Sequence, residues 1–161
     1  MQVWRIGADT PDYTADDLHG LGAKVTGGRW NRAGLPVVYC AGSIALAALE
    51  TLVHLGAGAL PLNRYLVRID IPDAIWNRRH SLPLPAAPVG WDALPTGKVS
   101  LDVGDTWLNS LESAVLAVPS IVVPEEFNYL INPRHSDAAK LKATKIRKWR
   151  YDERPVSYTH L

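Results

Sequence analysis

The chain has 161 residues, of which 47% are hydrophobic and 20% are charged. This composition is typical of one globular domain with a substantial core, and it excludes a disordered chain. A formal net charge of +1 gives no basic surface of the kind that nucleic-acid binding needs. The single cysteine, Cys40, excludes an intrachain disulfide.

Neither an export signal nor a membrane segment is predicted. Residues 1–5 lack the apolar core of a signal peptide. The low-charge segment between Ala33 and Asn63 is interrupted by glycines and contains Glu50, which argues against a membrane span. We therefore expect a cytoplasmic protein with no membrane partner and no direct contact with nucleic acid. Residues 154–161 do not continue the preceding pattern, and we expect a disordered or foreign tail after a domain of residues 1–153.

The predicted elements are mostly strands. Apolar and alternating runs predict them, in chain order, at residues 3–6, 36–41, 64–71, 114–123 and 127–133. In the first strand, Trp4 and Ile6 face one side and Arg5 the other. Pro119 interrupts the fourth strand, which is typical of an edge or a bend.

The segments between these strands are loops and a few helices. Residues 8–22 and the proline-rich residues 80–97 predict loops, and residues 103–111 predict a short helix. The Lys- and Arg-rich residues 140–150 predict a solvated surface strand or helix. Strands predominate, so we expect a single α+β domain with a mixed or antiparallel sheet and flanking helices.

The clearest helix is predicted at residues 44–55, with Ser43 as its N-cap. Ser43, Ala47, Glu50 and His54 are spaced to lie on one stripe. Because the helix carries so few charges, we expect it to be covered on nearly all sides. Glu50, the only charged residue between residues 33 and 63, must then face a partner or a wet cavity, since burying an unpaired carboxylate costs several kcal/mol.

A second candidate group precedes the second strand. Gly27 and Gly28 permit a backbone that points N–H groups at an anion, although an ordinary turn is the simpler interpretation. Arg29 offers a rigid donor fork that suits phosphate or carboxylate. The alternative for Arg29 is a structural ion pair with Glu50 or an aspartate.

Three further observations concern the chemistry of a site. Glu50 is suited to stabilise a developing cation, accept a sugar hydroxyl or act as a general base, unless it forms a buried ion pair with Arg29 or Arg64. Tyr39 offers a flat face and a hydroxyl, although a core tyrosine is the commoner case. Ser120 lacks the GxSxG context of a nucleophile. The histidines and Cys40 lack metal-ligand spacing, so we expect no metal site.

Two segments together resemble a known family. The strings GGRWNRAGLPVVYCAGSIALAALETLVH and VPSIVVPEEFNYLINPRH look like the RES-domain toxins of bacterial toxin–antitoxin pairs. The arginine, glutamate and serine that name the family correspond here to Arg29, Glu50 and Ser120. The resemblance extends from Trp4 to about Trp149. It implies a fold similar to ADP-ribosyltransferase toxins, with NAD⁺ as substrate rather than cofactor and no other cofactor.

The resemblance also implies roles and partners. Glu50 would stabilise the ribosyl cation left when nicotinamide departs, and Tyr39 would stack on nicotinamide or ribose. Arg29, with the backbone of Gly27 and Gly28, would hold the pyrophosphate. Ser120 would hydrogen-bond the substrate from the opposite wall, with Asn31 and His54 as further substrate-binding candidates. The expected partner is an antitoxin with an Xre-like part that covers the active site, and a homodimer is compatible with the family.

Three functions therefore follow as hypotheses. The first is a toxin that cleaves the nicotinamide–ribose bond of NAD⁺ with water or phosphate as acceptor. The second is a protein mono-ADP-ribosyltransferase, which differs only in its acceptor. The third is a non-catalytic module that binds a dinucleotide or a partner protein.

Overall fold

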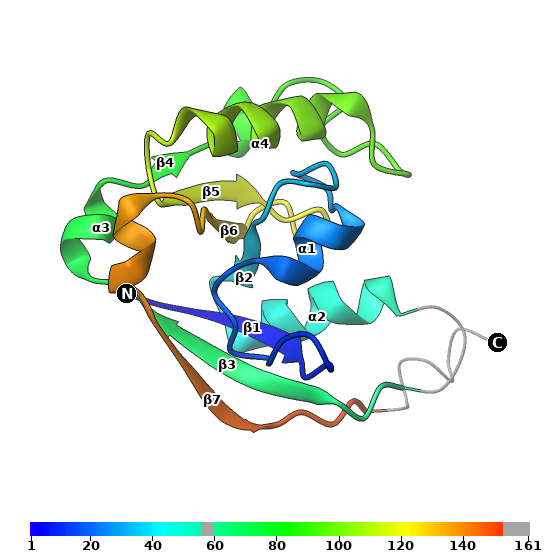
Figure 1. The fold of residues 1–161 in the computed structure, drawn as a ribbon. Helices are drawn as coiled ribbons and strands as arrows, with labels where there is room; N and C mark the ends of the chain where they lie inside the picture. The colour runs from blue at the N-terminus through cyan, green and yellow to red at the C-terminus, as the bar shows by residue number, and fades with distance from the viewer. Residues whose placement is uncertain (56–59, 153–161) are drawn as a thin grey trace, which may run out of the picture.

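The computed structural model describes residues 1–55 and 60–152, so the tail expected at residues 154–161 lies outside the described residues. Within those residues seven strands form one sheet in the order β4-β5-β6-β2-β1-β3-β7 (Figure 1). Neighbouring strands are antiparallel except β4 and β5, which are parallel. The prediction of an α+β domain with a mixed sheet is confirmed. The strands are β1 (Gln2–Ala8), β2 (Val38–Ala41), β3 (Arg64–Asp70), β4 (His80–Ser81), β5 (Val115–Pro119), β6 (Phe127–Ile131) and β7 (Lys142–Lys148).

The helices are short and lie around this sheet. They are α1 (Leu21–Thr26), α2 (Ile44–His54), α3 (Asp73–Asn77) and α4 (Lys98–Ser110), with 3₁₀ turns at Leu84–Ala86 and Ser136–Lys140. The expected helix near residue 103 begins earlier, at Lys98. Helix α1 was not predicted: it begins at the end of the loop predicted at residues 8–22, and it has no buried residue and hence no apolar period to detect. Along the described chain, no helix has the length and apolar character that crossing a membrane would need.

Two edge features agree with the sequence. Strand β5 ends at Pro119, and β4 pairs only with Leu116 and Ala117, so β4 does not require an N–H from the proline. The basic segment forms β7 at the outer edge of the sheet beside β3. Charged side chains on an edge strand discourage pairing with other chains, so this placement suits a solvated strand.

The centre of the sheet is split between β1 and β2. Strand β1 pairs with β3 along its whole length, from Gln2 to Ala8, but with β2 only at Trp4↔Ala41. Since β1 continues beyond Trp4 without a partner in β2, the two strands diverge there. This divergence leaves a gap between residues 5–8 of β1 and residues 37–40 of the facing segment.

The core is built on both faces of the central strands. In β3, Leu66 and Val67 are adjacent and therefore point to opposite faces, and both are buried. Leu66 packs in a cluster with Ile6 and Leu46, beneath α2. Val67 belongs to a larger cluster on the opposite face, with Ile69 and other apolar side chains from several strands.

Helix α2 confirms one prediction and corrects another. Ser43 is its N-cap, and the Ser43 hydroxyl accepts a hydrogen bond from the Leu46 N–H at 3.1 Å. The expectation that the helix is covered on nearly all sides is wrong, because Leu49 and Val53 are 39% and 54% exposed. Leu46 and Ala47 of α2 are buried and pack on the sheet, whereas Leu49 and Val53 present apolar side chains to solvent.

The loop that follows α1 is fastened to α4 and to the proline-rich segment. Gly104 of α4 lies directly against the Trp30 carbonyl, where any side chain would collide with it. The Trp30 ring stacks on Trp91, with centroids 6.1 Å apart. The Arg32 guanidinium binds the carboxylates of Asp102 and Asp105 in α4. These contacts fix the backbone that directly follows Arg29.

We expect Gly104→Ala to destabilise the protein by about 1–3 kcal/mol, because the new methyl group collides with the Trp30 carbonyl. Alanine alone would favour the helix by about 1 kcal/mol over glycine, so a net loss isolates the collision. Urea denaturation measures the free energy of unfolding. Thr106→Ala, at an exposed position of the same helix, is the control and should lose little. Equal stability of Gly104→Ala and the wild type would show that the helix and the loop do not touch.

Candidate functional site

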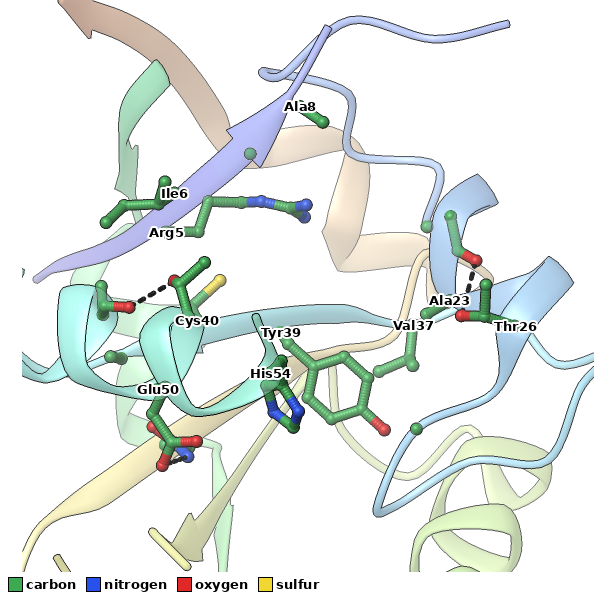
Figure 2. Close-up of a pocket in the computed structure, with 18 of the residues that line it drawn as sticks. Arg5, Ile6, Ala8, Ala23, Thr26, Val37, Tyr39, Cys40, Glu50 and His54 are labelled. Atoms are coloured by element: carbon green, nitrogen blue, oxygen red, sulfur yellow. Dashed lines mark hydrogen bonds between the residues drawn. The ribbon is translucent and has the colours of Figure 1, made fainter. Parts of the chain in front are cut away.

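A cavity of about 830 Å³ occupies the gap between β1 and β2 (Figure 2). One wall is β1 from Trp4 to Ala8, and the facing wall is Val37 with Tyr39–Ala41. Helix α1 and the loop through Trp30 close one side, and α2 closes another. The cavity therefore exists because the two central strands separate after a single pair.

Glu50 enters this cavity from α2, on the predicted stripe. Ala47, Glu50 and His54 all line the cavity, as their helical spacing predicts. The Glu50 Oε1 atom accepts hydrogen bonds from the Ser120 hydroxyl at 2.5 Å and from the Asn128 amide Nδ2 at 2.8 Å. Oε1 accepts both hydrogen bonds, and Oε2 takes part in neither of them. The carboxylate is thus held in place by neutral donors.

Arg29 lies in the same cavity but is held by main-chain oxygens. Its Nη1 donates to the carbonyls of Trp91 and Ala93, each at 3.0 Å. Partial burial lowers the pKa of Arg29, and the charge of Glu50 acts in the opposite direction. An arginine nevertheless stays protonated at neutral pH. Arg29 and Glu50, which both lie in the described part of the chain, form no ion pair with each other. The alternative interpretation of a buried Arg29–Glu50 pair is therefore excluded.

The Gly27–Gly28 backbone does not form the anion site that its sequence allowed. The Gly27 N–H donates to the Ala23 carbonyl and ends α1, with a positive φ of 71°. The Gly28 N–H donates to the Asn31 carbonyl. Both N–H groups are therefore used inside the protein. Gly28 is required for another reason, since a Cβ there would lie 2.7 Å from the Tyr39 hydroxyl oxygen.

Tyr39 and Asn31 form one hydrogen-bonded unit behind the cavity wall. The Tyr39 hydroxyl donates to Asn31 Oδ1 at 2.6 Å and accepts from the Trp30 N–H at 3.0 Å. The Asn31 amide donates to the carbonyls of Ala23 and Leu35, and the residue is fully buried. Burial is the main cause that raises the pKa of Tyr39, so its hydroxyl stays neutral. The ring of Tyr39 lines the cavity, whereas Asn31 holds the loop in shape.

The structure places Ser120 behind Glu50 rather than on an open wall facing it. The Ser120 side chain is fully buried, and its oxygen accepts from the N–H groups of Val122 and Val123 while its proton goes to Glu50. The two main-chain N–H groups hold the Ser120 hydroxyl in place, and that hydroxyl in turn positions the Glu50 carboxylate. A direct contact of Ser120 with substrate, and the same contact for Asn31 and His54, stay predictions.

Residue-by-residue reading of the sequence missed two members of the site. Asn128 of β6 is the second donor to Glu50, and a single asparagine in a strand gives no pattern that signals this role. Arg5 of β1 reaches into the cavity (Figure 2). The alternation of residues 3–6 did place Arg5 opposite Trp4 and Ile6, which was the available signal.

Cys40 also lines the cavity, but burial raises its pKa to about 12. It is therefore a neutral thiol at physiological pH and a poor nucleophile. In the part of the chain that the structure describes, the His, Cys, Asp and Glu side chains form no group of three that could hold a metal ion. The chemistry available in the cavity is that of a fixed carboxylate, an arginine, an aromatic ring and a histidine.

Such an arrangement suits a ligand with an anionic part and a part that becomes cationic. Arginines bind anions, and a carboxylate fixed in a partly dry cavity stabilises positive charge that develops next to it. Because neutral groups hold Glu50, its negative charge is not neutralised by a neighbour. The cavity is large enough for a ligand of nucleotide size.

Comparisons with known proteins agree with this architecture. The family profile described as RES domain matches residues 2–153. A protein of Sphingobium sp. named Prs ADP-ribosylating toxin is 55% identical over 153 residues, which are 95% of each chain. A protein of Pseudomonas putida named Toxin Res is 40% identical over 144 residues, 88% of this chain and 91% of that one. A crystal structure of the M. tuberculosis MbcT–MbcA toxin–antitoxin complex shares the fold, with a TM-score of 0.60 at 18% identity, covering 99% of this chain and 87% of that one.

We expect Tyr39→Phe to destabilise the protein by about 1–3 kcal/mol, because the buried Asn31 oxygen and the Trp30 N–H both lose their partner. Chemical denaturation of the purified variant measures the change. Tyr65→Phe is the matched control, since the contact of its ring with Lys145 does not need the hydroxyl. If both variants unfold at the wild-type denaturant concentration, the hydroxyl of Tyr39 does not support the loop.

Proposed function

Because this chain belongs to the RES domain family, we propose that it is the toxin of a toxin–antitoxin pair and that it consumes NAD⁺ by cleaving the nicotinamide–ribose bond. The observation that carries this proposal is the Glu50 carboxylate, fixed by Ser120 and Asn128 in a cavity that Arg29 shares. The likeness to relatives named toxins supports the biological role.

The proposed reaction needs few groups. Nicotinamide leaves NAD⁺ as a neutral molecule and takes the electron pair of the C–N bond, so no acid is required. The ribose C1′ becomes positively charged, and Glu50 stabilises that charge without itself reacting. Water or phosphate then attacks C1′ and, when water attacks, releases a proton to solvent. Arg29 holds the anionic diphosphate, and the ring of Tyr39 offers a flat surface to the nicotinamide or ribose.

A protein mono-ADP-ribosyltransferase is the second candidate. It shares every step up to the ribosyl cation and differs in the acceptor. The specific observation in its favour is the 55% identity with a protein named Prs ADP-ribosylating toxin. A binding module without turnover is the third candidate, and NAD⁺ would then stabilise the fold and remain intact.

The partner proposed for this chain is an antitoxin with an Xre-like part that covers the cavity. The apolar side chains of Leu49 and Val53 lie exposed on α2, the helix that supplies Glu50. A protein surface that covers them would contact the helix that also supplies Ala47, Glu50 and His54 to the cavity wall. A homodimer and a cytoplasmic location, where NAD⁺ is abundant, belong to the same proposal.

Nicotinamide release by the purified chain tests the reaction, with and without phosphate in the buffer. Labelled NAD⁺ incubated with cell extract then identifies the acceptor. Label as free ADP-ribose or its phosphate ester supports cleavage, whereas label on a protein band supports transfer. Intact NAD⁺ after hours, together with thermal stabilisation by NAD⁺, would contradict both enzymatic candidates.

We expect Glu50→Gln to lower kcat for nicotinamide release by about 10²-fold or more, while KM changes little. The amide oxygen of glutamine still accepts from Ser120 and Asn128, so the fold is retained but the negative charge is lost. Steady-state kinetics and the thermal unfolding temperature are measured together. Glu125→Gln, at an exposed position, is the control and should match the wild type in both. Wild-type kcat in the Glu50→Gln protein would contradict the proposed role.

A further inference from the structure

Arg5 is an unexplained cation in the cavity wall. It lies on β1, one residue past the single pair that joins β1 to β2. Its side chain extends from β1 across the gap toward the α1 side, with Cys40 and Tyr39 on the facing strand (Figure 2). Glu50 and His54 approach the cavity from α2 instead. Arg5 and Glu50 therefore reach the cavity from different walls.

The guanidinium of Arg5 is not neutralised by the surrounding protein. Its Nε is buried and has no hydrogen-bond partner within residues 1–55 and 60–152. The ion pairs formed between described residues do not include Arg5, although other arginines such as Arg32 and Arg68 are paired with aspartates. Leaving a buried charged donor unsatisfied costs more than leaving a neutral one, so a ligand that accepts a hydrogen bond from Arg5 would stabilise this position.

The charges that line the cavity favour an anion. The lining includes the three arginines Arg5, Arg29 and Arg64 against two carboxylates, Asp17 and Glu50. Arg29 already uses one nitrogen, Nη1, for two main-chain carbonyls. The Gly27 and Gly28 N–H groups are committed inside the protein. Two arginines of the described cavity lining, Arg5 and Arg64, have a buried Nε without a partner. Arg64 lies on β3, whereas Arg5 lies on β1 at the strand gap itself.

We propose that Arg5 binds a phosphate oxyanion in the gap between β1 and β2. A guanidinium presents a planar fork that matches two phosphate oxygens, and it does so best where water is partly excluded. This inference rests on the proposed function, which supplies two sources of that chemistry. One is the diphosphate of the dinucleotide, and the other is inorganic phosphate as acceptor.

Binding measurements that need no turnover test the assignment. Arg5→Gln and Arg5→Met remove the charge and keep a side chain of similar length, and calorimetry gives their affinities for ADP-ribose and for inorganic phosphate. We expect affinity to fall at least about tenfold for one of the two anions, the size of one lost charged hydrogen bond. A loss for ADP-ribose assigns Arg5 to the diphosphate, and a loss for phosphate alone assigns it to the acceptor.

Arg68→Gln is the matched control, because Arg68 lies on the neighbouring strand β3 and pairs with Asp70. A purely structural role for Arg5 would lower the unfolding temperature of its variants while their affinities stay at the wild-type level. That result, or failure of both variants to fold, overturns the inference. If the wild type releases no nicotinamide but binds ADP-ribose in an Arg5-dependent manner, the proposed reaction fails and the assignment of Arg5 stands.

Discussion

The site depends on the separation of β1 and β2 after the pair Trp4↔Ala41. In a continuous antiparallel sheet, residues 5–8 would pair with the residues that precede Ala41, and no cavity would exist between them. The divergence instead turns the centre of the sheet into a pocket with strand walls on two sides. Rigid strands hold side chains more precisely than loops do, so the residues of this pocket are fixed by the fold itself.

Opposite charges share this cavity without cancelling each other. Glu50 receives its hydrogen bonds from a serine and an asparagine, and Arg29 donates to two main-chain carbonyls. A direct ion pair between Arg29 and Glu50 would have neutralised both charges, so neither would have been available to a ligand. Neutral partners keep both side chains in position and leave both charges available. The buried serine of the RES motif is then explained as the support of the glutamate.

Much of the fold and part of the site could be predicted from the sequence. Apolar and alternating runs located β1, β2, β3, β5 and β6, whereas β4 lies in a segment predicted as loop. The spacing of Ala47, Glu50 and His54 correctly placed them on one cavity-facing stripe. The exposed apolar side of α2 could not be predicted, because a low charge content does not distinguish a covered helix from a helix with an exposed apolar face. The role of Asn128 was also out of reach, since it depends on which strand lies beside β2. The use of the Gly27 and Gly28 N–H groups depends on the end of α1, a helix with no sequence signal.

The split sheet also links ligand binding to the stability of the strands. Alternate residues of a strand direct their main-chain groups to opposite sides, so beyond Trp4 some groups of β1 face the cavity instead of a neighbouring strand. A molecule that fills the gap can replace the missing ladder and bridge the two halves of the sheet, β4-β5-β6-β2 and β1-β3-β7. Anything that binds only the folded state raises its apparent stability by mass action. Removal of such a molecule would therefore weaken the seam between the halves and lower the resistance of the protein to unfolding.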